Sequence, residues 1–267
     1  MKRRPNYYLY IGGVLTAVTV ITIIIGFFWT PYDPNAVSAA SKFASPSIHH
    51  ILGCDNMGRD IFSRVIEGAG TTLIISAATV IIGTVIGTLL GAFTGYYGGL
   101  PDEILMRICD AITAFPSILL ALVLVSIMGS GKYNIIIILG ILFVPSYSRI
   151  IRSEYAKCRE LNYVKNAKIM GAGDLRIMFV HILPNIIPVL LPAVTIGFNN
   201  AVLAEASMSF LSIGVQPPDP SLGRMLSESQ TYLFTAPWYA LGTGFAIVIL
   251  ILAFSLLGEG LQRRNKQ

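Results

Sequence analysis

The sequence has little charge for its length, and this absence excludes most soluble proteins. Only 12% of the residues are charged, against 54% that are hydrophobic, and the mean hydropathy is +0.69. Such a balance is typical of chains that lie in a lipid bilayer. We therefore predict an all-α, polytopic membrane helix bundle that is surrounded by lipid. The net charge of +5 is expected to lie at the membrane ends of helices, so nucleic-acid binding is not expected.

Motifs of several enzyme classes are also missing. A G-x-x-x-x-G-K-[ST] phosphate loop does not occur, and the nearest fragment, Gly129 to Lys132, lacks both the upstream glycine and the following Ser or Thr. The sequence has no His-Glu zinc motif and no G-x-S-x-G elbow. We therefore expect no catalytic residue, no cofactor and no ATP hydrolysis in this chain.

Cysteine and histidine are scarce. Cys54, Cys109 and Cys158 fall in three different compartments of the predicted topology, so no disulfide is expected. His49 and His50 lie near Cys54, but no acidic or sulfur side chain completes a set of ligands there. We expect no metal site, because zinc requires four ligands, or three and a water molecule.

Six apolar segments are long enough to cross a hydrocarbon core about 30 Å thick. They are residues 8–29, 72–95, 104–128, 133–151, 185–211 and 238–258. Pro116 interrupts the third segment and is expected to bend it. The first segment is not followed by the small residues of a signal-peptide cleavage site, so it is expected to remain as an anchor.

Basic residues predict the orientation of these segments. They cluster before the first segment, between the fourth and fifth, and after the last, at Lys2, Arg3, Arg4, Arg149, Arg152, Lys157, Arg159, Lys165, Lys168, Arg176, Arg263, Arg264 and Lys266. Basic residues remain preferentially on the cytoplasmic side. Both termini and the loop 152–184 are therefore predicted to be cytoplasmic, in the cell membrane of a bacterium.

We divide the chain into an N-terminal anchor with an external segment, residues 1–71, and a membrane core, residues 72–267. Within the external segment, residues 59–67 have an apolar helical face opposite a polar face that carries Arg59, Asp60 and Arg64. The pattern predicts a separate amphipathic helix on the outer membrane surface. This helix could merely lie at the interface, or it could contact an external partner.

Small and ionisable residues mark positions inside the predicted spans. Glycines recur every fourth residue in the second span, at Gly83, Gly87, Gly91 and Gly95, which predicts close helix packing. Arg107 and Asp110 are three residues apart in the third span and are predicted to pair with each other. Glu205 near the outer end of the fifth span is a further candidate polar site.

The loop between the fourth and fifth spans carries the clearest candidate for a binding surface. Its first half has an apolar helical face, made of Tyr163, Val164, Ala167 and Met170, opposite a polar face that includes Lys165. Gly171 and Ala172 are expected to form an elbow. Asp174 is expected to cap a second short helix that Pro184 ends.

This loop resembles the signature of permease subunits of ATP-binding-cassette importers, in which Glu-Ala-Ala is followed after three residues by Gly and after nine more by Ile-x-Leu-Pro. Here Lys165-Asn166-Ala167, Gly171 and His181-Ile182-Leu183-Pro184 keep the spacing, although the glutamate and the first alanine are replaced. Further segments are similar to the dipeptide, oligopeptide and nickel permease group, in the second of its two paired permeases. They are LGCDNMGRDIFSRVIEGA, MRICDAITAFPSILLA, EASMSFLSIGVQPPDPSLGRML and TAPW.

The resemblance implies a transmembrane domain of the type I importer class with a set of partners. They are a homologous permease, two cytosolic ATPases that bind ATP and magnesium, and an external solute-binding protein. Residues 163–174 of the loop would then contact an ATPase. A peptide is the first choice of substrate, and nickel or a metal chelate is the alternative. An ion-coupled secondary transporter is a rival, but few ionisable residues in the spans support it.

Overall fold

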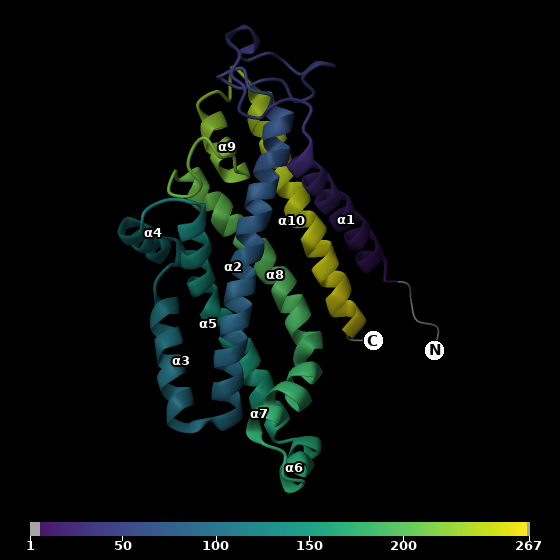
Figure 1. The fold of residues 1–267 in the computed structure, drawn as a ribbon, viewed down its shortest axis with the longest axis vertical. Helices are drawn as coiled ribbons and strands as arrows, with labels where there is room; N and C mark the ends of the chain where they lie inside the picture. Colours follow the sequence, from purple (N-terminus) through teal and green to yellow (C-terminus); the bar gives the residue numbers. More distant parts are fainter. Residues whose placement is uncertain (1–5, 266–267) are drawn as a thin grey trace.

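The computed structural model describes residues 6–265 as an elongated bundle of helices (Figure 1). The helices in chain order are α1 (Tyr7–Phe28), η1 (Ala39–Ser41), α2 (Ile61–Tyr97), α3 (Gly99–Ala114), α4 (Ser117–Met128), α5 (Lys132–Arg159), α6 (Asn162–Ile169), α7 (Asp174–Arg176), η2 (Ile177–Ile182), α8 (Leu183–Phe210), α9 (Leu222–Gln230) and α10 (Pro237–Asn265). The all-α prediction is confirmed, and no β-strand occurs between residues 6 and 265.

Five stretches of helix are long and apolar enough to cross a membrane, and α3 with α4 makes a sixth if the bent pair is one crossing. This agrees with the predicted six spans. The chain alternates in direction, so the α2–α3 turn and α6 lie at one end of the bundle, and residues 29–60 and α9 lie at the other (Figure 1). We call residues 29–60 the cap. Lys2, Arg3, Arg4 and Lys266 lie outside the described residues.

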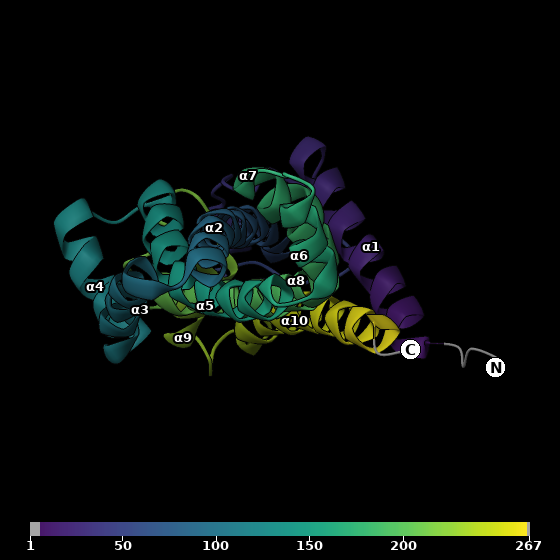
Figure 2. The ribbon, with the colours of Figure 1, turned by 90° about the horizontal axis from the view of Figure 1, so that it is seen from below.

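The third span is broken where Pro116 was expected to bend it. α3 and α4 meet at an angle of 92°, with Phe115 in an extended conformation. A proline disfavours helical geometry at the residue before it and cannot donate a backbone hydrogen bond. The apolar segment therefore forms two helices, and α4 turns sideways from the axis of α3 (Figure 2).

The glycine stripe of α2 faces α5, and the prediction of close packing is confirmed. A Cβ atom at Gly91 would lie 2.5 Å from the carbonyl oxygen of Ser148, and one at Gly95 would lie 2.7 Å from Cβ of Tyr155. Without side chains along this stripe the two backbones come into direct contact. α2 and α5 consequently form the most extensive helix pair in the bundle.

The predicted external helix at residues 61–67 is not separate, because it forms the first two turns of α2. Its expected polar face is also buried: Arg64 is 1% exposed and Asp60 is 4% exposed. Asp60 caps α2 by accepting a hydrogen bond of 2.8 Å from the backbone N–H of Ser63. The predicted division between residues 71 and 72 thus falls within a continuous helix.

The helix that begins at Asp174 continues through Pro184, so the expectation that this proline ends it is wrong. The chain passes from α7 into a π-helical segment, η2, and then into α8. Pro184 is tolerated because it lies in the first turn of the α8 segment, where a missing N–H disturbs the hydrogen-bond pattern least.

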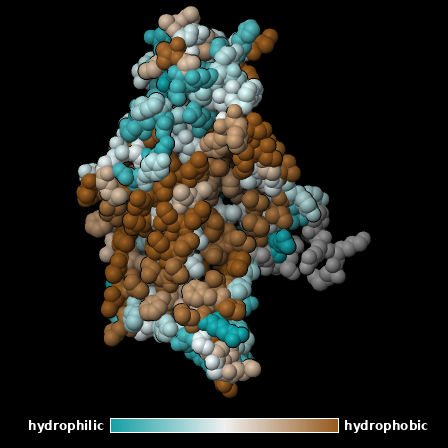
Figure 3. All heavy atoms as spheres, in the orientation of Figure 1, coloured by the Kyte–Doolittle hydropathy of each residue, from teal (hydrophilic) through white to brown (hydrophobic). Residues whose placement is uncertain are grey.

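Polar residues concentrate toward the ends of the molecule, and hydrophobic residues form a broad band between them (Figure 3). At one side of the bundle α1 packs along α10, and the Asn6 amide donates a hydrogen bond of 2.6 Å to the carbonyl oxygen of Gly260. The start of α1 and the end of α10 are therefore neighbours. This arrangement fits an even number of membrane crossings.

Candidate functional site

The elbow at Gly171 has a defined hydrogen-bond geometry. Gly171 has φ +81°; its N–H donates to Lys168 O, and the Ala172 N–H donates to Ala167 O, both at 3.0 Å. This pair of bonds is the Schellman motif, which ends a helix with a residue in the left-handed conformation. Glycine reaches that conformation without steric cost. The predicted elbow at Gly171 is confirmed.

The apolar face of α6 packs against its own chain. Val164 is completely buried, and Tyr163, Ala167 and Ala172 pack around it. This cluster also contains residues of α2, α5, η2 and α8, namely Ala92, Tyr96, Ile151, Tyr155, Ile177, Met178, Ile182 and Ile186. Val164 is therefore not available to a partner, and Tyr163 and Ala167 are half-buried, while contact of this face with an ATPase stays a prediction. The spacing correctly identified a buried face, but the chain itself covers it.

A different apolar surface remains exposed at this end of the molecule. Ile169 is 83% exposed and Met170 is 87% exposed, and Leu175 beyond the elbow is also exposed. We call Ile169, Met170 and Leu175 the tip. Of the predicted surface only Met170 belongs to it. Ile169 and Leu175 were missed, although their position on either side of Gly171 could have indicated them.

Asp174 does not cap the second short helix, because Gly173 holds that position. The Asp174 carboxylate instead accepts a hydrogen bond of 2.6 Å from the Tyr96 hydroxyl at the end of α2. The Tyr155 hydroxyl of α5 donates to the Met178 carbonyl oxygen at 3.0 Å. These bonds tie the segment after the elbow to both α2 and α5.

Charged groups around α6 are mostly basic and lie on its outer side. Lys165 is exposed and its Nζ is 3.7 Å from Glu160 Oε2, and Lys168 lies 4.8 Å above the ring of Tyr96. Burial and the neighbouring Cys158 thiol raise the pKa of Tyr163 to about 12. Tyr163 is therefore neutral at physiological pH, as its place beside an apolar cluster requires.

The predicted pair between Arg107 and Asp110 does not form. Asp110 instead accepts a hydrogen bond of 2.9 Å from Nη2 of Arg149 on α5, and Arg107 is exposed. Glu205 is completely buried, and its Oε1 accepts a hydrogen bond of 2.7 Å from the Ser209 hydroxyl one turn later. Of Arg107, Asp110 and Glu205, only Asp110 therefore forms an ion pair within the described residues.

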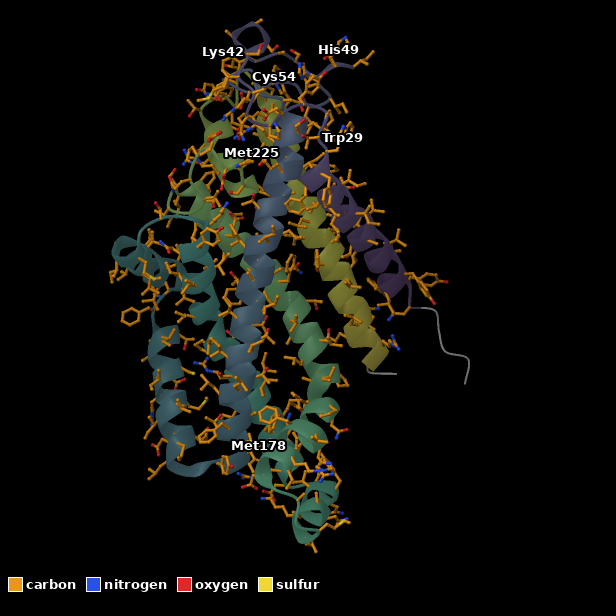
Figure 4. The ribbon with its side chains drawn as sticks, viewed as in Figure 1. Trp29, Lys42, His49, Cys54, Met178 and Met225 are labelled. Atoms are coloured by element: carbon orange, nitrogen blue, oxygen red, sulfur yellow. The ribbon has the colours of Figure 1, made fainter. Side chains whose placement is uncertain are left out.

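The three cysteines are free, with Cys54 before α2, Cys109 on α3 and Cys158 on α5. Cys54 is in the cap, at the opposite end of the molecule from Met178 and the α6 cluster (Figure 4). Burial, together with Asp60 and Asp55, raises the pKa of the Cys54 thiol to about 11. The buried thiol of Cys54 is thus mostly protonated and poorly reactive at neutral pH.

Comparison with known families now identifies the chain. Residues 87–267, more than half of the sequence, match the family described as "Binding-protein-dependent transport system inner membrane component". The chain belongs to this family. It is a multi-pass permease subunit of an ATP-binding-cassette importer, a transporter subunit and not itself an enzyme.

Relatives and solved structures agree with this assignment. The permease is 39% identical over 255 residues to the glutathione transport system permease protein GsiD of Pectobacterium atrosepticum, covering 94% of this chain and 85% of the relative. It is 40% identical over 261 residues to GsiD of Salmonella typhimurium, covering 97% and 86%. Its fold is similar to a chain of the MetNI methionine ABC transporter in an inward-facing conformation, with a TM-score of 0.63, 19% identity and coverage of 76% and 97%.

Substitution of Gly171 tests the elbow of the permease. Gly171→Val should abolish transport while leaving membrane insertion intact, because a β-branched residue at φ +81° is strained by about 1–3 kcal/mol. Gly171→Asn should retain part of the activity, since asparagine tolerates the left-handed region better. ATP-driven uptake and the amount of permease in the membrane are the two measurements.

Gly173→Val is the matched control for this substitution. A Cβ at either glycine would have no atom of this chain within 4 Å, but Gly173 has φ −68°, which valine adopts freely. The two sites have equal space for a side chain and differ in backbone conformation. Equal uptake by Gly171→Val and Gly173→Val would contradict the role of the left-handed elbow.

Proposed function

We propose that this permease forms one half of the translocation path of an importer for short peptides, including tripeptides of the glutathione type. The observation that carries this proposal is the identity of about 40% to glutathione permeases over nearly the whole chain. A homologous permease would form the other half of the path, and an external solute-binding protein would deliver the peptide. Nickel or a metal chelate is the competing substrate.

The tip is the surface we assign to contact with an ATPase subunit. Packing in the permease holds α6 in place through Tyr163, Val164, Ala167 and Ala172. Gly171 sets the elbow, and Ile169 and Met170 are exposed. Lys165 at the edge of this surface adds a positive charge. Two partner ATPases would bind ATP and Mg²⁺, and their closure would displace α6 as one body with the ends of α2, α5 and α8.

Orientation in the membrane follows from the distribution of basic residues. The end with α6 carries most of them, whereas the cap end carries few, among them Arg59, which is paired with Asp55, and Lys132, which is paired with Asp219. By the positive-inside rule the α6 end and both termini are cytoplasmic. The cap then faces the outside and is available to the solute-binding protein.

Cysteine labelling tests this orientation. A membrane-impermeant maleimide added to intact cells should label Met57→Cys in the exposed part of the cap and should not label Ile169→Cys at the tip. Native Cys54 should contribute little signal, since a pKa of about 11 leaves about one thiol in ten thousand ionised at pH 7. Labelling of Ile169→Cys before the membrane is permeabilised would reverse the assigned orientation.

The substrate is tested with the complete importer reconstituted in proteoliposomes. We expect ATP-dependent uptake of a labelled tripeptide such as glutathione, with competition by other short peptides. Nickel ions should neither accumulate nor compete at the same concentrations. ATP-dependent nickel accumulation without peptide uptake would overturn the peptide assignment and leave the permease assignment in place.

A further inference from the structure

A seam of exposed polar side chains runs along α3, α4, α5 and α8. We define the seam as Asp110 and Thr113 of α3, Ser117 of α4, Ser146 and Arg149 of α5, and Asn200 of α8. All six residues are exposed in the isolated chain, although the helices that carry them are predominantly apolar. The proposed ATPase surface accounts for none of them.

The seam has two parts that adjoin each other. Ser117, Ser146 and Asn200 line a cavity of about 290 Å³ between α4, α5 and α8, whose remaining lining is mostly apolar. One turn further along α5, Arg149 donates from Nη2 to Asp110 at 2.9 Å and to Thr113 at 2.6 Å. A neutral hydrogen-bonding cavity thus lies next to an exposed ion pair.

Lipid is an unsuitable neighbour for this surface. Asp110 is eleven residues beyond the start of α3 at Gly99, about 16 Å along the helix axis. Its paired partner Arg149 lies inside the apolar segment 133–151, two residues before its end. Exposed charged groups in apolar segments, together with the exposed Ser117, Ser146 and Asn200 of the same segments and of 185–211, face protein or a water-filled space, because transferring them into hydrocarbon is costly. The seam therefore marks the side of the permease that faces the path.

We propose that the seam is this chain's wall of the path and that it contacts a short zwitterionic peptide in transit. The inference rests on the proposed function and names the contacts of that function. The hydroxyls of Ser117 and Ser146 and the amide of Asn200 would hydrogen-bond the peptide backbone. Arg149 and Asp110 would meet the carboxylate and ammonium groups of the peptide.

The geometry of Arg149 suits this role. Its hydrogen bonds within the described chain all use Nη2, to Asp110, Thr113 and the Cys109 carbonyl oxygen. The guanidinium edge formed by Nε and Nη1 is left for a carboxylate, which arginine binds through two parallel N–H groups. Arg149 is 44% exposed and Asp110 is 58% exposed in side-chain terms, so both can be reached from the seam.

A second ion pair between the same two helices provides the comparison. Arg152 of α5 binds Asp102 of α3 through two nitrogens, with Nη2 at 2.6 Å from Oδ2, and the Asp102 side chain is only 15% exposed. Its burial fits a latch that holds α3 against α5. If the Arg149–Asp110 pair were also only a latch, the two pairs should respond alike to reversal of their charges.

Charge reversal in the complete reconstituted importer separates the two roles. The double variant Arg149→Asp with Asp110→Arg restores an ion pair but exchanges the positions of the charges facing the path. We expect it to lower the uptake of a zwitterionic tripeptide about tenfold or more, the size of effect given by a charge-assisted hydrogen bond. The double variant Arg152→Asp with Asp102→Arg should keep uptake within about twofold.

Asn200→Leu should raise the peptide concentration for half-maximal uptake, with less effect on the maximal rate.

The outcomes distinguish this inference from the proposed function. If the wild-type importer takes up no peptide with ATP, the proposed function fails first. If the wild type transports and the Arg149–Asp110 reversal transports equally well, the pair is a latch and the seam is not a peptide contact. Equal loss of uptake in both reversals would also contradict the inference, because the two pairs would then act alike.

Discussion

Replacing both Ile169 and Met170 with aspartate should separate the permease from its ATPases. Both side chains are more than four-fifths exposed in the isolated chain, and large apolar side chains exposed on a loop outside the membrane-spanning helices indicate a surface that a partner covers. An unpaired charge buried in that contact costs a few kcal/mol, about a hundredfold or more in affinity. Copurification of tagged permease should therefore recover little ATPase, and hydrolysis should no longer respond to loaded binding protein.

The matched control is Ile48→Asp, which changes an equally apolar and almost fully exposed residue of the cap. It lies at the other end of the molecule and should leave the ATPases bound. The amount of permease in the membrane should be the same for both variants, because none of the three side chains packs in the core. Normal copurification and uptake by the Ile169→Asp, Met170→Asp variant would exclude the tip as the coupling surface.

Ala167→Asp cannot provide this test. Ala167 is half-buried against the cluster around Val164, so a charge there would disturb the permease itself. Loss of the ATPases would then have two causes. The comparison of Met170 with Ala167 thus separates binding of a partner from the folding of α6.

Replacing Arg64 with leucine should lower stability more than any exposed substitution in the cap. The Arg64 side chain is nearly inaccessible, with Nε at 3.7 Å from Asp55 and Nη2 at 3.9 Å from Glu228. It also donates to the Pro34 carbonyl oxygen at 3.1 Å, which ties the cap to α2. Removing the arginine leaves the buried Asp55 with fewer partners, and loss of one member of such a network costs about 3–5 kcal/mol.

Arg224→Leu provides the comparison for Arg64→Leu. Arg224 binds the same Glu228 at 3.2 Å, but its side chain is ten times more exposed than that of Arg64. A partly solvated pair contributes about 1 kcal/mol or less. Thermal unfolding of the purified permease should thus show a much larger decrease in midpoint for Arg64→Leu. Equal decreases would show that burial of Arg64 adds nothing to its contribution.

The sequence was sufficient for features that depend on local spacing. Apolar length predicted the spans, the four-residue repeat of Gly83 to Gly95 predicted contact with another helix, and Gly171 predicted the elbow. Each of these follows from the geometry of one helix or one turn. In such cases the residues that are close in the sequence are enough to predict the structure.

Features that depend on partners distant in the sequence could not be predicted. Arg64 belongs to a polar pattern that is typical of a solvated helix face, and only the fold brings Asp55 and Glu228 to it. Asp110 has Arg107 at a suitable helical spacing, yet Arg149 from α5 binds it instead. The face of α6 that contains Val164 is buried as its pattern predicted, but no pattern states which surface covers it.

Uptake by the complete importer with and without ATP inside proteoliposomes tests the central claim most directly. The experiment contains the permease, its paired permease, the ATPases and the binding protein, with a labelled tripeptide as substrate. Our account predicts accumulation only when ATP can be hydrolysed, and none from the permease pair alone under a proton or sodium gradient. Gradient-driven accumulation by the permease without ATPases would contradict it.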